Sequence, residues 1–223
     1  MQSPDSPFFS VVIPVFNRPD YLRAAIESVR AQTWADYEII VVDDGSTDDG
    51  VAQLLNEHRS SVRSIHQENA GQAVARNRAA AEAKGKYLAF LDSDDVWYPH
   101  TLATFADLIN QYDQPSMLMG LPVDWDDQTP VPVVEAAEPQ ADAYPRALDA
   151  PLGDGFVGSC VMVVDRAAFQ RVGGFIEVRH NGEDLDLLLR LSVEPGFVWV
   201  RQPATLAYRA HDGNSIKQSA STV

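Results

Sequence analysis

Two acidic clusters in this chain each follow directly on an apolar run. Asp43-Asp44 comes after residues 39–42, and Asp92-Ser93-Asp94-Asp95 comes after residues 87–91. A short β-prone apolar run that ends in polar residues is typical of a buried strand, and open α/β sheets bind their ligands where the strands end. Carboxylates this close repel one another. A hard divalent cation with an anionic, phosphorylated ligand is the simplest reason to gather them there.

Strand and helix patterns alternate from residue 8 to about residue 121, which is typical of βαβ units that build a mostly parallel sheet flanked by helices. The sequence therefore predicts an α/β fold. Strands are expected at 9–15, 38–42, 62–66, 87–91, 117–121, 159–164, 197–200 and 205–209, and helices from Pro19, after Gly50, at 72–83, from Pro99, at 166–172 and at 184–193. In the last of these helices, the apolar spacing predicts an inner face of Leu185, Leu188, Leu189 and Val193.

Residues 122–155 differ from the rest of the chain in composition. They contain six prolines, many acidic residues and alanines, and little periodicity. This pattern predicts a long loop or insertion. It is either a lid that binds an acceptor or a passive excursion.

Composition excludes some classes of protein. The net charge of −15 argues against a nucleic-acid surface, since phosphate backbones require clustered Lys and Arg. The single cysteine, Cys160, lies in an apolar stretch and is expected to be a buried structural thiol. The first residues lack the pattern of a signal peptide, and no apolar run is long enough to cross a bilayer. We therefore expect a cytoplasmic, soluble protein that could associate peripherally with a membrane.

Five motifs occur in order along the chain. They are Val11-Val12-Ile13-Pro14-Val15-Phe16-Asn17-Arg18, Val41-Val42-Asp43-Asp44-Gly45-Ser46-Thr47-Asp48, Ala75-Arg76-Asn77, Leu91-Asp92-Ser93-Asp94-Asp95 and Gly182-Glu183-Asp184. Together they resemble the signature of family 2 glycosyltransferases with the GT-A fold. The resemblance implies a single domain over 1–223, with a Rossmann-like nucleotide-sugar-binding half at about 8–121 and a flexible loop at 122–155. The resemblance also implies a smaller acceptor-binding and catalytic half at 156–215 and a tail at 216–223.

The resemblance implies a divalent cation, Mn²⁺ or Mg²⁺, at the second acidic cluster. Asp95 matches the acid that ligates the metal directly in the family, and Asp94 matches the acid that contacts the ribose or a bound water. Asp92 matches the first acid of the Asp-x-Asp motif. It would act either as a ligand or as a support for a ligand. His211 resembles a late histidine that reaches the metal or the diphosphate, although a lone histidine is as often an ordinary polar residue.

The same resemblance assigns a nucleotide pocket. Asp44 would accept a hydrogen bond from the base, most simply from N3–H of uracil, and Pro14, Phe16 and Asn17 would line the pocket. Arg76 resembles the family's arginine near the base and the diphosphate. Its alternative is an exposed arginine on the surface of a helix.

Glu183 and Asp184 form the other decisive motif. A carboxylate within reach of an acceptor hydroxyl is the simplest general base. By resemblance Asp184 is this base, and Glu183 assists it or binds the acceptor. The alternative is structural, because acidic residues in the first turn of a helix interact favourably with its dipole. A base on the acceptor side and a leaving group held opposite imply a single displacement with inversion.

The sequence thus predicts an inverting, metal-assisted glycosyltransferase of glycan biosynthesis. Its donor would be a nucleotide sugar, most simply a UDP-sugar, and its acceptor a hydroxyl on a glycan, a lipid-linked molecule or a small molecule. A homodimer remains open. The alternative from another class is a nucleotide-sugar-binding partner or regulatory protein without catalysis.

Overall fold

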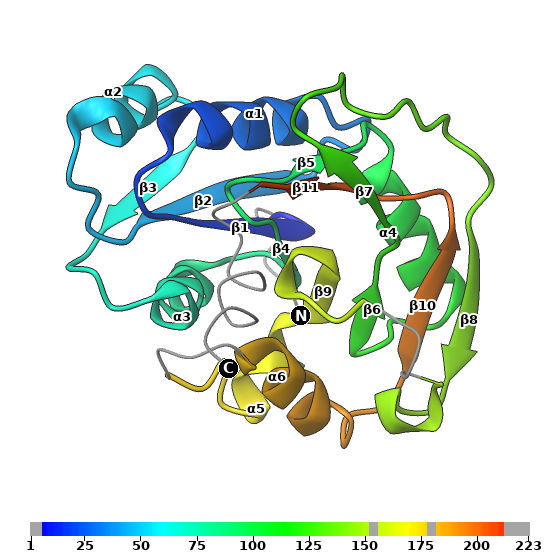
Figure 1. The fold of residues 1–223 in the computed structure, drawn as a ribbon. Helices are drawn as coiled ribbons and strands as arrows, with labels where there is room; N and C mark the ends of the chain where they lie inside the picture. Colours follow the sequence, from blue (N-terminus) through cyan, green and yellow to red (C-terminus); the bar gives the residue numbers. More distant parts are fainter. Residues whose placement is uncertain (1–5, 152–155, 178–181, 212–223) are drawn as a thin grey trace, which may run out of the picture.

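The structure, a computed structural model, describes residues 6–151, 156–177 and 182–211. In this part of the chain two sheets are flanked by helices (Figure 1). From edge to edge, the larger sheet consists of β3 (Arg63–His66), β2 (Tyr37–Asp43), β1 (Phe9–Val15), β4 (Tyr87–Phe90), β9 (Met162–Asp165), β6 (Met117–Met119), β10 (Phe197–Gln202) and β8 (Gln140–Tyr144). The smaller sheet consists of β5 (Val96–Trp97), β11 (Leu206–Ala210) and β7 (Pro122–Asp126).

The described helices lie on both faces of the larger sheet. They are α1 (Pro19–Arg30), α2 (Asp49–Glu57), α3 (Gln72–Glu82), α4 (Thr101–Gln111), α5 (Arg166–Arg171) and α6 (Glu183–Leu191), with 3₁₀ turns η1 (Ala147–Asp149) and η3 (Ser159–Val161). Helices α1 and α2 cover one face, and α3, α5 and α6 cover the other (Figure 1). Within these residues, none of the helices has both the length and the hydrophobicity of a membrane span. The predicted α/β fold is confirmed.

The N-terminal strands explain where the first acidic cluster lies. β1 pairs in parallel with β2 and with β4, and Val15 at the end of β1 lies opposite Asp43 at the end of β2. All seven residues of β1 are buried, because helices cover both faces. The continuous apolar runs that predicted these strands are the signature of such burial. The carboxyl ends of β1, β2 and β4 therefore meet at one edge.

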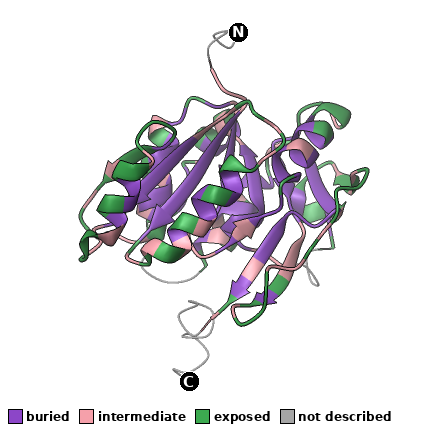
Figure 2. Cartoon of the chain, turned by 90° about the horizontal axis from the view of Figure 1, so that it is seen from above, coloured by how far each residue is buried: buried purple, intermediate pink, exposed green. Residues whose placement is uncertain are grey.

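The remaining strands make the larger sheet mixed. β9 is antiparallel to both β4 and β6, while β6 and β10 are parallel. Figure 2 shows the central strands of this sheet buried, whereas the edge strands β3 and β8 carry exposed residues, as do the outer sides of the helices and the loops. Below the sheet, the rings of Phe90, Phe169 and Phe175 pack at centroid distances of 5.2 to 5.7 Å. Phe175 of this aromatic cluster contacts Arg76 and Asn77 on α3.

Residues 122–155 contain more regular structure than their composition predicts. Residues 122–126 form β7, which pairs in parallel with β11. Residues 140–144 form β8, an antiparallel edge strand next to β10. The prediction of a segment without regular structure is therefore wrong for these two strands. Both depend on partners in the last quarter of the chain, so local periodicity could not reveal them. Residues 152–155 lie outside the described residues.

The predicted inner face of the last helix is also wrong. Leu185, Leu189 and Val193 are exposed, while Leu187 and Leu191 are buried. Of the predicted set, Leu188 alone is buried. Leucines occupy both sides of this helix, so their spacing does not distinguish the two faces. The buried stripe begins with Glu183, four residues before Leu187, because that carboxylate meets a buried arginine.

Other boundaries shift by a few residues. The strand predicted at 159–164 begins with η3 and is extended only from Met162. Asp165 caps α5 as its sequence position suggests, since its side chain accepts a hydrogen bond from the amide of Ala168 at 2.8 Å. The predicted tail at 216–223 lies outside the described residues.

Asn77 joins α3 to a segment almost one hundred residues away. Its side chain donates to the carbonyl of Phe175 at 2.8 Å and accepts from the amide of Phe175 at 2.9 Å. Replacing Asn77 with Ala leaves both backbone groups without this partner, so we expect a loss of about 1–3 kcal/mol in the free energy of unfolding. Urea titration followed by circular dichroism measures this. Asn56→Ala, the same change at an exposed position of α2, is the control and should alter it by less than about 0.5 kcal/mol.

Candidate active site

A cavity of about 240 Å³ opens where the N-terminal strands end. Its lining comes from the end of β1, from the loops that follow β1, β2 and β4, from the start of α3 and from one residue of β11. The lining residues are Pro14, Val15, Phe16, Arg18, Asp44, Gln72, Asp92, Ser93, Asp94 and Tyr208. Residues of both acidic clusters therefore face one space, as the sequence analysis requires.

Asp44 forms one wall of the cavity and also holds the turn that precedes α3. Its Oδ1 accepts hydrogen bonds from the side chain of Gln67 at 2.7 Å and from the amide of Ala70 at 2.9 Å. Its Oδ2 accepts one from the amide of Gly71 at 2.9 Å. A carboxylate oxygen can accept two hydrogen bonds. Oδ2 thus keeps capacity for a donor from the cavity, although Asp44 is only 4% exposed.

The loop after β1 has an unusual backbone. Asn17 and Arg18 both have positive φ angles, 59° and 62°. Hydrogen bonds hold this conformation, since the amide of Asn17 donates to Ser46 Oγ and its side chain accepts from the amide of Thr47. Pro14 and Phe16 line the cavity as predicted, and the Phe16 ring is 44% exposed. Asn17 does not line it and instead ties this loop to the loop after β2.

Arg76 is fully enclosed by acidic side chains. Its guanidinium donates to Asp92 at 2.6 Å and to Glu183 at 3.3 Å, and it lies 3.8 Å from Asp184. Its Cζ lies 5.4 Å from the centroid of the Phe175 ring. With 1% exposure, Arg76 is not the surface arginine that the sequence left as an alternative. Burial opposes its charge, but the carboxylates outweigh this effect and raise the pKa of Arg76 above its usual value.

Glu183 and Asp184 have different surroundings although they are neighbours. Glu183 is 2% exposed, and it accepts hydrogen bonds from Arg76 and from the side chain of Gln72. Asp184 has 24% of its side chain exposed, and its Oδ1 has no hydrogen-bond partner among the described residues. Burial raises the pKa of Asp184 to about 6, although Arg76 counteracts the rise. A carboxylate of this kind is suited to accept a proton near neutral pH.

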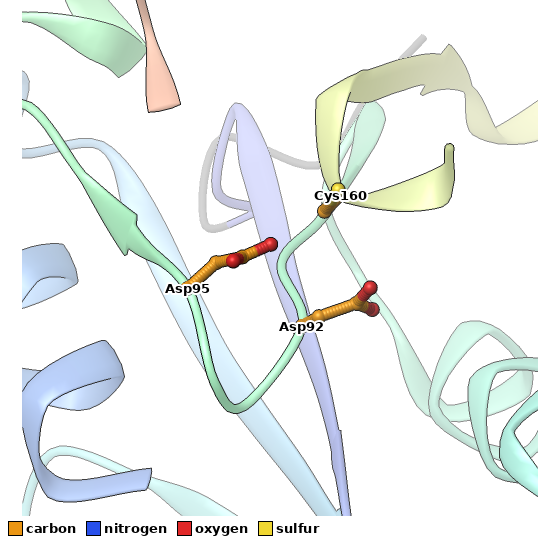
Figure 3. Close-up of side chains that lie close together, drawn as sticks. All are labelled: Asp92, Asp95 and Cys160. Atoms are coloured by element: carbon orange, nitrogen blue, oxygen red, sulfur yellow. The ribbon is translucent and has the colours of Figure 1, made fainter. Parts of the chain in front are cut away.

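The second acidic cluster divides into exposed and buried members. Asp92 and Asp94 line the cavity, whereas Asp95 is 1% exposed and accepts a hydrogen bond from the amide of Arg209 at 2.9 Å. Figure 3 shows Asp95 and Asp92 on one loop with Cys160 beside them, and the three offer ligand atoms within 4.8 Å of one another. Burial and the charges of Asp92 and Asp94 raise the pKa of Asp95 well above its usual value.

Asp94 is bracketed by two basic side chains. Its Oδ2 lies 2.9 Å from Nη1 of Arg18 and 2.9 Å from Nε2 of His211. The ring of His211 packs against that of Tyr21, with centroids 5.2 Å apart. The late histidine is thus brought to the acidic cluster, where an imidazole, a guanidinium and a carboxylate meet at the cavity.

The donor set fits a hard divalent cation. Such ions prefer carboxylate and phosphate oxygens, and they commonly take one or two carboxylates from the protein. Asp92 and Asp95 offer such oxygens within 4.8 Å of each other and of Cys160, and Asp94, which contacts His211, lies on the same loop. One oxygen of Asp95 is buried without a hydrogen-bond partner among the described residues. This oxygen can therefore serve as a further acceptor in the acidic cluster.

Three cavity residues, Arg18, Gln72 and Tyr208, were not predicted from the sequence. Gln72 contacts Glu183, and Tyr208 lines the wall from β11. Arg18 stands at the end of the first motif and could have been assigned from its charge. Gln72 is an ordinary residue in the first turn of a helix. Tyr208 is a half-buried residue of a strand, and nothing in its sequence position distinguishes it from other such tyrosines.

Comparison with known proteins gives a consistent result. The model of the family described as "Glycosyl transferase family 2" matches residues 10–171. The uncharacterized glycosyltransferase YibD of Escherichia coli is 49% identical over 102 residues, which are 44% of this chain and 30% of YibD. The uncharacterized glycosyltransferase RP339 of Rickettsia prowazekii is 31% identical over 185 residues, which are 82% of this chain and 58% of RP339.

A solved structure has the same fold. The crystal structure of residues 1–349 of S. aureus TarS in complex with UDP-GlcNAc superposes with a TM-score of 0.77 at 22% identity. The alignment covers 94% of this chain and 60% of the TarS chain. This chain therefore spans less than two thirds of the length of each of these similar proteins. Since the family match extends over most of the sequence, the chain belongs to glycosyl transferase family 2.

Proposed function

We propose that this protein is an inverting glycosyltransferase that transfers a sugar from a UDP-sugar to a hydroxyl acceptor with the help of a divalent cation. The observation that carries the proposal is the position of Arg76. One guanidinium contacts Asp92 on the cavity side and lies 3.8 Å from Asp184 on the other side. The acid that faces the donor and the acid suited to act as base are therefore held by a single buried charge.

The nucleotide would occupy the cavity between the first two strand ends. The free acceptor capacity of Asp44 Oδ2 suits N3–H of uracil, and the exposed ring of Phe16 suits stacking on a base. The UDP-GlcNAc bound to TarS supports a uridine nucleotide as the donor.

The diphosphate would lie toward the second acidic cluster. Asp95 would hold the cation together with Asp94, with Asp92 as a further ligand or as a support for one, and His211 would reach it beside Asp94. When bound, the cation neutralises the charge that develops on the leaving diphosphate. Arg18, which already lies at Asp94, can add a second positive charge on the same side.

Asp184 would accept the proton of the attacking hydroxyl. With a pKa of about 6 it is mostly ionised at neutral pH and remains basic enough to take a proton in the transition state. Glu183 is engaged by Arg76 and Gln72, so its role is to orient the start of α6. A base on the acceptor side and a leaving group held opposite correspond to a single displacement with inversion.

The donor assignment predicts nucleotide selectivity. UDP presents N3–H to Asp44, whereas the N3 of CDP carries a lone pair that faces the carboxylate. The buried acceptor would then lose a donor, so we expect UDP to bind at least about tenfold more tightly than CDP. Calorimetric titration with each nucleotide in the presence of Mn²⁺ measures this ratio. Equal affinities contradict the proposed role of Asp44.

The base assignment predicts the effect of Asp184→Asn. We expect transfer to fall by at least about a thousandfold while UDP affinity changes less than threefold, because the general base is lost and the nucleotide pocket is not. Asp186→Asn, two residues along the same helix, is the matched control. It removes an ion pair with Arg190 and should leave transfer within twofold. Transfer that persists in Asp184→Asn contradicts the assignment, and absence of transfer in the unaltered protein with every donor favours a binding protein.

The pH dependence follows from the raised pKa of Asp184. The base works only when ionised, so kcat/KM should be constant above the pKa and fall about tenfold per pH unit below about 6. An unperturbed aspartate would place this decline near pH 4. Initial rates between pH 4.5 and 8.5 in constant ionic strength measure it. An acidic limb centred near pH 4 disagrees with Asp184 in this environment as the base.

A further inference from the structure

Arg209 lies behind the second acidic cluster and contacts it twice. Its amide donates to Oδ1 of Asp95 at 2.9 Å, and its side-chain Nε donates to the backbone carbonyl of Asp94 at 2.6 Å. Arg209 is 5% exposed and does not line the cavity. It therefore fixes the backbone of the loop that carries Asp94 without facing the space that a ligand would occupy.

The guanidinium of Arg209 is itself held by three side chains from distant parts of the chain. Its Cζ lies 4.5 Å from the ring centroid of Tyr21 on α1 and 4.1 Å from that of Trp125 on β7. Its Nη1 donates to Asp127, which also accepts a hydrogen bond from the hydroxyl of Tyr21 at 2.9 Å. We call Tyr21, Trp125, Asp127 and Arg209 the Arg209 cluster.

The geometry of the Arg209 cluster uses properties that only arginine has. The planar guanidinium places Nε and Nη1 at fixed directions, so one side chain can bind the Asp94 carbonyl and the Asp127 carboxylate together while its face meets aromatic rings. Lysine keeps the charge but lacks this fixed arrangement. The carbonyl of Asp94 would then lose its buried donor, and the loop would lose its defined position.

We propose that Arg209 is a positioning residue that orients the acidic loop for a cation and a nucleoside diphosphate. The inference rests on the proposed function, because the loop that Arg209 holds carries the cation ligands that are proposed there. Arg209 touches neither ligand. It acts through the backbone of Asp94, whose carboxylate meets Arg18 and His211 at the cavity.

The test compares Arg209→Lys with a matched control. Arg201 on β10 also meets an aromatic ring and a carboxylate, with its Cζ 4.3 Å from the Trp199 ring centroid and its Nε 2.7 Å from Asp142, but it is exposed and lies outside the cavity lining. Affinities for UMP and for UDP are measured by calorimetry with and without Mn²⁺, after circular dichroism has established folding. Mn²⁺ should strengthen UDP binding in the unaltered protein and in Arg201→Lys.

In Arg209→Lys we expect the Mn²⁺-dependent gain in UDP affinity to fall at least tenfold while UMP affinity changes less than twofold. A merely structural role would weaken UMP and UDP equally, and that result overturns the proposal, as does a folded variant that keeps the full gain. If Arg209→Lys does not fold, the same titrations are made with Asp127→Asn. In that variant we expect the Mn²⁺-dependent gain in UDP affinity to fall at least threefold. If the unaltered protein binds no UDP with Mn²⁺, the proposed function fails and this inference fails with it.

Discussion

The buried charge of Arg76 is the interaction on which the arrangement of the site depends. An isolated guanidinium in a protein interior would cost many kcal/mol, so it must be surrounded by opposite charges and hydrogen-bond acceptors. Asp92 comes from the loop after β4, and Glu183 and Asp184 come from the start of α6. Since α3 carries Arg76, these three elements have to meet at one point. The second acidic cluster and the pair Glu183-Asp184 are thereby brought together.

The same interaction leaves the site short of positive charge. Arg76 supplies one charge to three carboxylates, and Asp95 is buried nearby with a raised pKa. Such a cluster is less stable than an apolar core of the same size would be, which is typical of sites built for a charged ligand. A cation would relieve the repulsion among Asp92, Asp94 and Asp95. The unfavourable electrostatics of the unliganded protein thus become part of its affinity for the donor.

Much of the N-terminal half could be predicted from the sequence because its signals are local. Buried parallel strands appear as continuous apolar runs, and Asp43, Asp44 and Asp92 stand where those runs end. The inner face of α6 could not be predicted, because leucines lie on both sides and the choice depends on Glu183 meeting Arg76, more than one hundred residues away. Strands β7 and β8 likewise depend on β11 and β10 as partners. The Arg209 cluster joins residues from three separate segments, namely α1, the end of β7 and β11, and each residue alone is an ordinary surface or strand residue.

These long-range contacts limit how far the two halves of the chain can be regarded as separate units. The acidic loop lies between β4 of the larger sheet and β5 of the smaller sheet, and both β5 and β7 pair with β11. Its position is set by bonds from Arg209 and His211, which follow it by more than one hundred residues. Closing a loop of that length costs conformational entropy that local contacts do not offset. Residues 8–121 therefore contain the contacts of Asp44 and the pair of Arg76 with Asp92, but not the bonds from Arg209 and His211 to Asp94 and Asp95. The geometry of the second acidic cluster thus depends on docking of the last strand.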